Sequence, residues 1–69
     1  MVQADDARTL RAALRRMPRR MATVLVLRHS GLSYAEVATA MGVKQGDVGT
    51  MLRRAESALR KEVERATSH

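Results

Sequence analysis

The 69-residue chain contains no cysteine, no phenylalanine and no tryptophan, and it has a single tyrosine. Without cysteine, neither a disulfide nor a thiolate zinc site can stabilise so short a chain, which fits a reducing compartment. With one aromatic side chain, the RNA-binding modules that stack bases on aromatic residues are not expected. The core must therefore consist of Leu, Val, Met and Ala, which suits small, closely packed helices.

Long apolar runs are also missing. No run approaches the roughly 20 residues of a membrane span, and nothing resembles a signal peptide. We therefore expect a cytoplasmic protein without a membrane partner.

Acidic residues are few: the chain has 7 Asp and Glu against 13 Lys and Arg, which gives a net charge of +6. Residues 8–28 contain no acidic residue and seven arginines, namely Arg8, Arg11, Arg15, Arg16, Arg19, Arg20 and Arg28. Such a balance favours an anionic partner, most often nucleic acid. The alternative is an arginine-rich surface that is merely solvated.

Groups that could carry catalysis are few. The chain has two histidines, of which His69 is the last residue, and Ser33 stands where a helix cap is expected. No phosphate-cradling glycine loop and no metal-ligand spacing is present. We expect neither an enzyme nor a cofactor or metal site.

Gly and Pro residues divide the sequence into four predicted helices. The first is expected over about 5–16, with Asp5 or Asp6 as its cap. The second is opened by Pro18, which a first helical turn tolerates, and closed by Gly31. Its "TVLVL" run could also form a strand, but no partner strand is in sight. The fold class is therefore all-α.

The third and fourth helices have clearer signals. Ser33 and Glu36 match the S-x-x-E capping box, and Leu32 with Val37 matches the hydrophobic staple. Gly42 ends this helix, and the last, long helix is expected from about residue 45 to 66. In that helix an apolar stripe recurs at spacings of three and four.

These two helices and their short turn predict a helix-turn-helix over about 33–54. Ala38 is small where the next helix crosses, Gly42 can take the positive φ of the turn, and Val48 plugs the space between the helices. The alternative is a small helical bundle in which this spacing is accidental.

The stretch "RRMPRRMATVLVLRHSGLSYAEVATAMGVKQGDVGTMLRRAESALRK" resembles region 4 of bacterial RNA polymerase sigma factors, most nearly the extracytoplasmic-function group. The resemblance covers about residues 8–62. It implies a four-helix domain that reads the promoter −35 element of double-stranded DNA with its last helix in the major groove. It also implies docking on the flap of the polymerase β subunit and masking by an anti-sigma factor.

The candidate DNA-contacting residues are Arg19, Arg20, Ser33, Tyr34, Lys44, Gln45, Gly46, Gly49, Thr50, Arg53 and Arg54. The resemblance places Tyr34, Arg53 and Arg54 on positions that lie near DNA in the family. Two positions depart from the family pattern. Gly49 stands where relatives often have Lys or Arg, and Met21–Ala22 stands where many have Gln-Arg. We expect Arg19 and Arg20 to take over the phosphate contact, and binding to be weak and strongly salt-dependent.

Several alternatives stay open. Arg53 could pair with Glu56 or with Glu36 instead of contacting DNA. The domain could be a protein-docking module with weak DNA reading, or the effector domain of a response regulator. The last helix extends well beyond its DNA-contacting part, and this apolar tail could pack back on the first helix or dimerise weakly; we expect a monomer. The chain fits one domain of a longer factor that also holds the segment for melting the −10 element.

Overall fold

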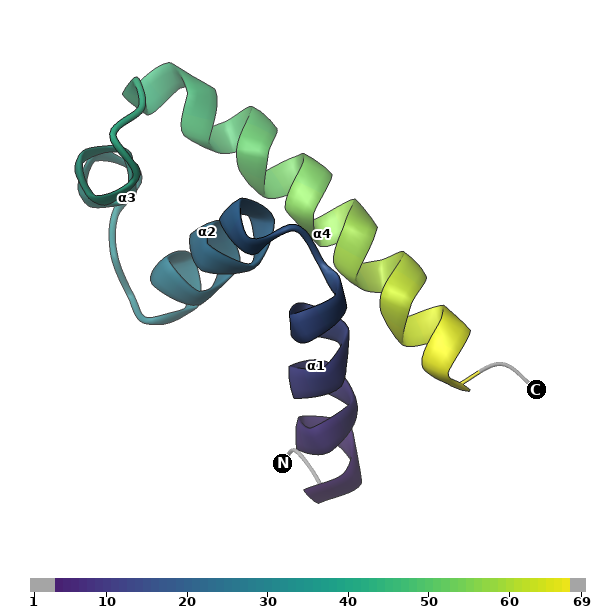
Figure 1. Ribbon diagram of the computed structural model, residues 1–69. Helices are drawn as coiled ribbons and strands as arrows, with labels where there is room; N and C mark the ends of the chain where they lie inside the picture. The colour runs from purple at the N-terminus through teal and green to yellow at the C-terminus, as the bar shows by residue number, and fades with distance from the viewer. Residues whose placement is uncertain (1–3, 68–69) are drawn as a thin grey trace.

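Four helices and their short connections make up the computed structural model, which describes residues 4–67, with side chains for residues 7–66 (Figure 1). The helices are α1 (Ala4–Arg16), α2 (Arg19–His29), α3 (Tyr34–Met41) and α4 (Gln45–Thr67). No strand occurs over residues 4–67, so the "TVLVL" run is helical and the all-α prediction is confirmed. No helix in this part of the chain is long and apolar enough to cross a membrane.

The starts of α1 and α2 differ slightly from the prediction. Because α1 begins at Ala4, Asp5 and Asp6 lie in its first turn rather than at its cap, and their side chains lie outside the described residues. Pro18 is the N-cap residue of α2, with φ −51° and ψ 136°, one position before the first turn. Arg19 and Arg20 therefore form the start of α2, which has no acidic residue in its first turn.

The two connections around α3 confirm the predicted signals. The Ser33 hydroxyl accepts a hydrogen bond from the Glu36 backbone N–H at 3.1 Å, and the Ser33 N–H donates to Glu36 Oε1 at 2.8 Å. Gly31, with φ 98°, follows Ser30, the C-cap residue of α2, and Gly42 ends α3 with φ 69° and ψ 34°. Both glycines have the left-handed backbone that ends many helices.

One cluster of aliphatic side chains holds the helices together. It contains Met17, Val24, Val37, Ala38, Val48, Leu52 and Ala55. Val24, Val37 and Val48 are completely buried and come from α2, α3 and α4. The core predicted from Leu, Val, Met and Ala is therefore the core observed.

The long helix α4 is the common support of the domain. Figure 1 shows α4 running the length of the molecule, with α3 packed near its start and α1 along its second half. α2 lies between them and packs against all three other helices, whereas α1 and α3 do not touch within the described residues. The helix-turn-helix and α1 therefore occupy different ends of a body measuring 39 × 21 × 16 Å.

Candidate nucleic-acid interface

One face of the first half of α4 is turned away from the core. Gln45, Gly46 and Arg53 are exposed and Gly49 and Thr50 are half-buried; we call these five residues the outer face of α4. On the opposite face of this helix, Val48, Leu52 and Ala55 are buried against the other helices. The structure thus groups these five predicted contact residues on one surface, as their spacing in the sequence indicated.

The start of α4 is polar and accessible. Lys44 is exposed immediately before the first turn, and its carbonyl accepts a hydrogen bond from the Asp47 N–H at 2.9 Å. The Asp47 carboxylate lies in the first turn, where negative charge complements the positive end of the helix dipole. Stabilisation of the helix start therefore explains why an acidic residue stands at position 47.

The Arg53 guanidinium contacts a hydroxyl rather than a carboxylate. Its Nη2 lies 3.4 Å from Thr50 Oγ1, one turn earlier on the same face. Among the side chains of residues 7–66, no ion pair joins Arg53 to Glu56 or to Glu36. The alternative in which Arg53 is held by one of these carboxylates is therefore wrong for this structure.

Arg54 lies on a neighbouring side of α4. It lines a shallow hollow between α2 and α4 together with Met21, Arg53, Ser57, Ala58 and Lys61. Three cations surround this hollow without a lining carboxylate. An anion that touches the outer face of α4 can therefore meet positive charge beside it.

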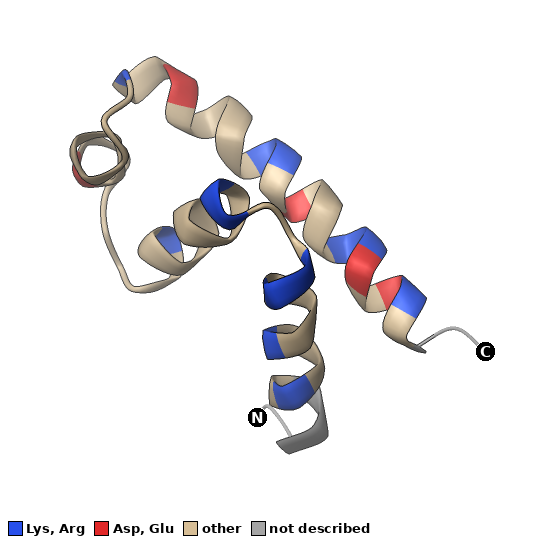
Figure 2. Ribbon diagram, viewed as in Figure 1, with Lys and Arg blue, Asp and Glu red and all other residues tan. Residues whose placement is uncertain are grey.

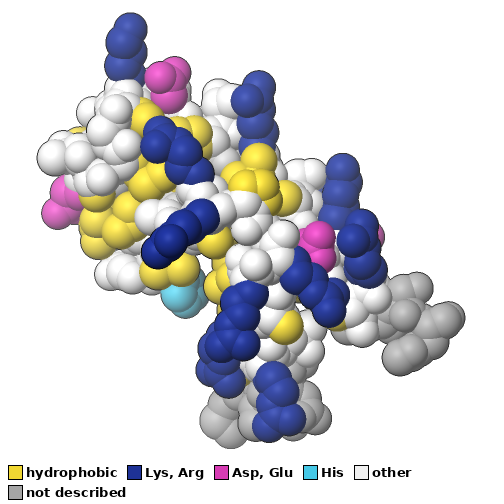
Figure 3. Space-filling model, in the orientation of Figure 1, with side chains coloured by type: hydrophobic (Ala, Val, Ile, Leu, Met, Phe, Trp, Pro, Cys, Tyr) yellow, Lys and Arg dark blue, Asp and Glu magenta, His cyan; other side chains and the backbone are white. Residues whose placement is uncertain are grey.

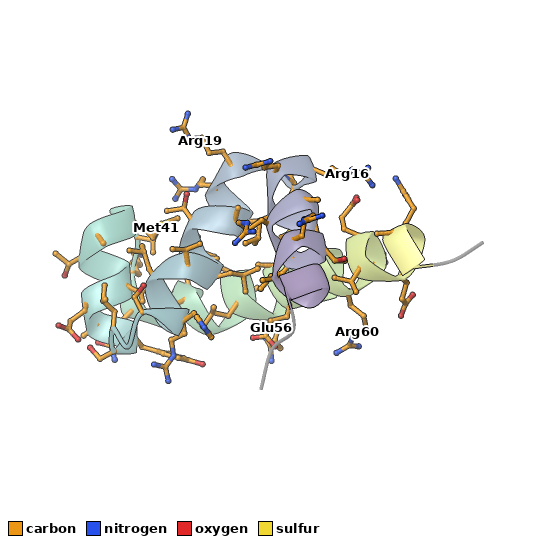
Figure 4. The ribbon with its side chains drawn as sticks, turned by 90° about the horizontal axis from the view of Figure 1, so that it is seen from below. Arg16, Arg19, Met41, Glu56 and Arg60 are labelled. Carbon is orange, nitrogen blue, oxygen red and sulfur yellow. The ribbon has the colours of Figure 1, made fainter. Side chains whose placement is uncertain are left out.

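Arg19 and Arg20 are separated from the start of α3. They line a hollow with Thr23, Ala40 and Met41, which places them beside the end of α3. In Figure 4 Arg19 and Met41 lie on one side of the domain, and Glu56 and Arg60 on the other. Ser33 and Tyr34, at the opposite end of α3, therefore belong to a different part of the surface from Arg19 and Arg20.

Tyr34 connects α3 with the outer face of α4. Its side chain is 41% exposed, and its Cε2 lies 3.8 Å from the position that a Cβ on Gly49 would occupy. The Arg28 guanidinium lies 5.3 Å from the centre of the Tyr34 ring. Arg28 was absent from the predicted contact residues, because only the path of the loop after α2 brings it here.

Ser33 has a structural role as well as a place at the start of α3. Its backbone N–H, and to a smaller extent its hydroxyl, hold the pKa of the Glu36 carboxyl below its ordinary value of 4.5. The Glu36 carboxylate is thereby committed to closing the helix end. This negative charge remains in place at neutral pH in the first turn of α3.

An apolar groove lies between α1, α2 and α4. It is lined by Leu10, Leu14, Leu25, Val26 and Leu59, together with His29 and Ser30. Leu10 is 41% exposed and Val26 is 51% exposed, so this groove holds two of the three exposed large apolar side chains of the described residues.

Basic side chains extend well beyond the helix-turn-helix. Figures 2 and 3 show Lys and Arg along α1, at the start of α2 and along α4. On α1 the four exposed arginines are Arg8, Arg11, Arg15 and Arg16. The positive charge is thus spread over the domain rather than confined to the outer face of α4.

Residues 7–59 match the family model of sigma-70, region 4. The chain belongs to the sigma-70 region 4 family. Neither a search of curated proteins nor a search of solved structures found a match. The matched range includes α2, α3 and the outer face of α4, and the predicted resemblance is confirmed at the level of the family. Sigma region 4 is a DNA-binding regulatory domain of transcription initiation, and as a family it interacts with DNA and RNA polymerase.

Proposed function

We propose that this sigma region 4 domain binds the promoter −35 element by placing the first turns of α4 in the major groove. The domain would act within a sigma factor, of extracytoplasmic-function type, that directs RNA polymerase to its promoters. The observation that carries the proposal is the solvent-facing outer face of α4, on a helix fixed from behind by Val48, Leu52 and Ala55. A major groove of B-DNA admits such a helix.

The side chains of this face suit a DNA-binding surface that makes few contacts with the bases. Arg53 can donate two hydrogen bonds to O6 and N7 of guanine, and Thr50 can bond a base edge or a phosphate. Gly46 and Gly49 carry no side chain, so the helix backbone itself can approach the DNA closely. Sequence preference would rest mainly on Arg53 and Thr50.

The remaining predicted residues suit phosphate contacts. Lys44 precedes α4, Arg54 flanks the outer face, and Ser33 and Tyr34 stand at the start of α3. Arg19 and Arg20 would reach a phosphate farther along the duplex, since they lie at the other end of α3. A large phosphate share makes the affinity fall steeply with salt.

The test is selection from a random duplex pool at low salt, followed by titration of the selected duplex over a salt series. Arg53→Ala should cost about 1–3 kcal/mol and relax the preference at one base pair. Arg8→Ala removes the same charge from α1 and should leave the selected motif unchanged. Recovery of no motif would contradict the proposal.

The apolar groove supports a second function, docking of a protein helix. A groove of exposed Leu and Val side chains between helices can accept the apolar face of a partner helix. We propose the polymerase β flap or an anti-sigma factor as that partner. Both functions can belong to one domain, because the groove and the outer face of α4 share no residue.

Val26→Asp tests the docking function without opening the core, because Val26 is half exposed. The variant should lose binding to polymerase core or to a β-flap fragment while the selected DNA motif is retained. Thr23→Asp adds the same charge to α2 outside the groove and serves as the control. Equal binding of the partner by the wild type and Val26→Asp would remove the groove from the interface. The double variant Arg53→Ala/Arg54→Ala should instead lose binding to the DNA and retain binding to the protein partner. Sedimentation of the free domain tests the expected monomer.

A further inference from the structure

A row of arginines on α1 borders the apolar groove. Leu10 and Leu14 line the groove, and Arg11 and Arg15 each follow one of these leucines in the sequence. A helix turns by about 100° per residue, so the two arginines lie directly beside the two leucines. Arg8, three residues before Arg11, extends the row, and all three arginine side chains are exposed. We call Arg8, Arg11 and Arg15 the arginine row of α1.

The arginine row has no anionic partner in the described part of the domain. No carboxylate of residues 7–66 lies within ion-pair distance of Arg8, Arg11 or Arg15. The sequence contains no acidic residue between positions 7 and 35, and Figure 2 shows basic residues along α1 and at the start of α2. The row can therefore pair with carboxylates that come from another molecule.

The α4 edge of the groove carries both signs of charge. Leu59 of α4 lines the groove, and Arg60 follows it in the sequence. Glu56 and Glu62 lie three residues before and after Leu59, and Glu62 Oε1 is 3.9 Å from Arg65 Nη1. The α1 edge, in contrast, carries only positive charge. A complementary partner is therefore acidic on the side that faces α1 and not on both sides.

The apolar lining indicates which kind of anion fits beside the arginine row. Leu10 and Val26 are 41% and 51% exposed, so a partner that covers them gains free energy from apolar burial. A DNA duplex presents a charged phosphate backbone on its outside and has no apolar ridge to fill such a groove. An amphipathic helix has an apolar face with charged side chains beside it, arranged as they are on α1. These features favour a protein helix.

We propose that the apolar groove accepts an amphipathic helix of a protein partner that carries carboxylates along the edge turned toward Arg11 and Arg15. The inference rests on the proposed docking function and adds the charge pattern that selects the partner. Burial of the apolar face supplies most of the affinity, because exposed ion pairs contribute little each. The arginine row discriminates between helices whose apolar faces fit equally well.

The experiment selects binders from a displayed library of amphipathic helices. Every member carries the same leucine face, and the flanking positions on both sides are randomised among Glu, Lys, Gln and Ser. Selection against the wild-type domain should enrich Glu on one flank only. The selected helix should lose most of its affinity for Val26→Asp, because the new carboxylate lies in the groove that its apolar face fills.

Matched charge reversals on α1 test the arginine row. Arg11→Glu and Arg15→Glu should each weaken binding of the selected helix roughly 5-fold, since each replaces attraction between exposed charges by repulsion. Arg16→Glu makes the same change two residues after Leu14, on the opposite side of α1, and should change the affinity little.

A reversal of preference gives the sharper test. The double variant Arg11→Glu/Arg15→Glu should bind a Lys-flanked copy of the selected helix more tightly than the Glu-flanked original. A variant that failed to fold would bind neither copy, so a reversed preference reports the charge pairing and not the stability of α1.

Several results would overturn the inference. Selected helices with no enrichment of Glu on one flank would leave the groove as a docking site but remove the arginine row from it. Selected helices that bind Val26→Asp as tightly as the wild type would lie outside the groove. A loss of affinity for the selected DNA duplex in Arg11→Glu but not in Arg16→Glu would assign the row to DNA. A dimer in sedimentation that Val26→Asp abolishes would make a second copy of the chain the occupant.

Failure of the docking function itself has a different signature. Recovery of no helix from the library, together with equal binding of the β-flap fragment by the wild type and Val26→Asp, would contradict docking in the groove. The inference would then fall with the proposed function, before any arginine variant is compared.

Discussion

Two glycines of the helix-turn-helix should respond to alanine with opposite signs. Gly42 ends α3 with φ 69° and ψ 34°, a conformation that costs an L-residue about 1–2 kcal/mol. No atom lies within 4 Å of a Cβ built there, so the cost of Gly42→Ala is conformational rather than steric. Gly49 lies inside α4, where alanine is favoured over glycine by about 0.5–1 kcal/mol.

The surroundings of Gly49 do not oppose this gain. The Cβ of Gly49→Ala would meet Tyr34 Cε2 at 3.8 Å, which is an ordinary van der Waals contact. The two variants should therefore differ in unfolding free energy by roughly 1.5–3 kcal/mol, with the wild type between them.

Thermal unfolding and urea titration of the three proteins measure this difference. For a domain of this size, 1 kcal/mol shifts the midpoint temperature by about 4–8 °C. Gly49→Ala should unfold at a higher temperature than the wild type, and Gly42→Ala at a lower one. A destabilised Gly49→Ala would refute the close but unstrained approach of Tyr34, and a neutral Gly42→Ala would refute the left-handed turn.

Three further predictions concern the core and the cap of α3. Leu52→Ala should cost about 2–5 kcal/mol, because Leu52 is buried beneath the outer face of α4, and an unchanged urea midpoint would contradict that burial. Ser33→Ala should cost about 0.5–2 kcal/mol by removing the cap, whereas Ser57→Ala, on exposed α4 surface, should change little. The lowered pKa of Glu36 means that its stabilising contribution is fully present above about pH 4.5 and is lost as the pH falls through the folded-state pKa. Glu36→Gln should flatten the pH dependence of unfolding in that acidic range, and an equally steep fall in the variant would exclude Glu36 as its source.

The helices could be predicted because their signals are local. The capping box of Ser33 and Glu36 involves residues three apart, and Gly31 and Gly42 act through their own backbone angles. The outer face of α4 follows from helical spacing alone. The prediction was wrong about the cap of α1, because the helix already includes Asp5 and Asp6.

The neighbourhood of Arg28 could not be predicted in the same way. Its contact with Tyr34 depends on how the loop over residues 30–33 turns, and the approach of Tyr34 to Gly49 depends on how α3 crosses α4. Neither is a property of spacing within one helix. Arg19 of α2 lies beside the last residues of α3, whereas Tyr34 is the first residue of α3. This separation likewise follows from tertiary packing.

The distribution of charge changes what the net charge of +6 indicates. Four exposed arginines lie on α1, which makes no contact with α3 in the described part of the chain, so they are poor candidates for base contacts. Charge at that distance acts through the field of the whole domain, which speeds encounter with an anionic partner and is screened by salt. Under the proposed function, sequence preference would come from the few fixed groups at the other end, chiefly Arg53 beside Thr50. The basic composition of the chain therefore argues for attraction to DNA in general, and only the geometry of α4 and its neighbours argues for reading a sequence.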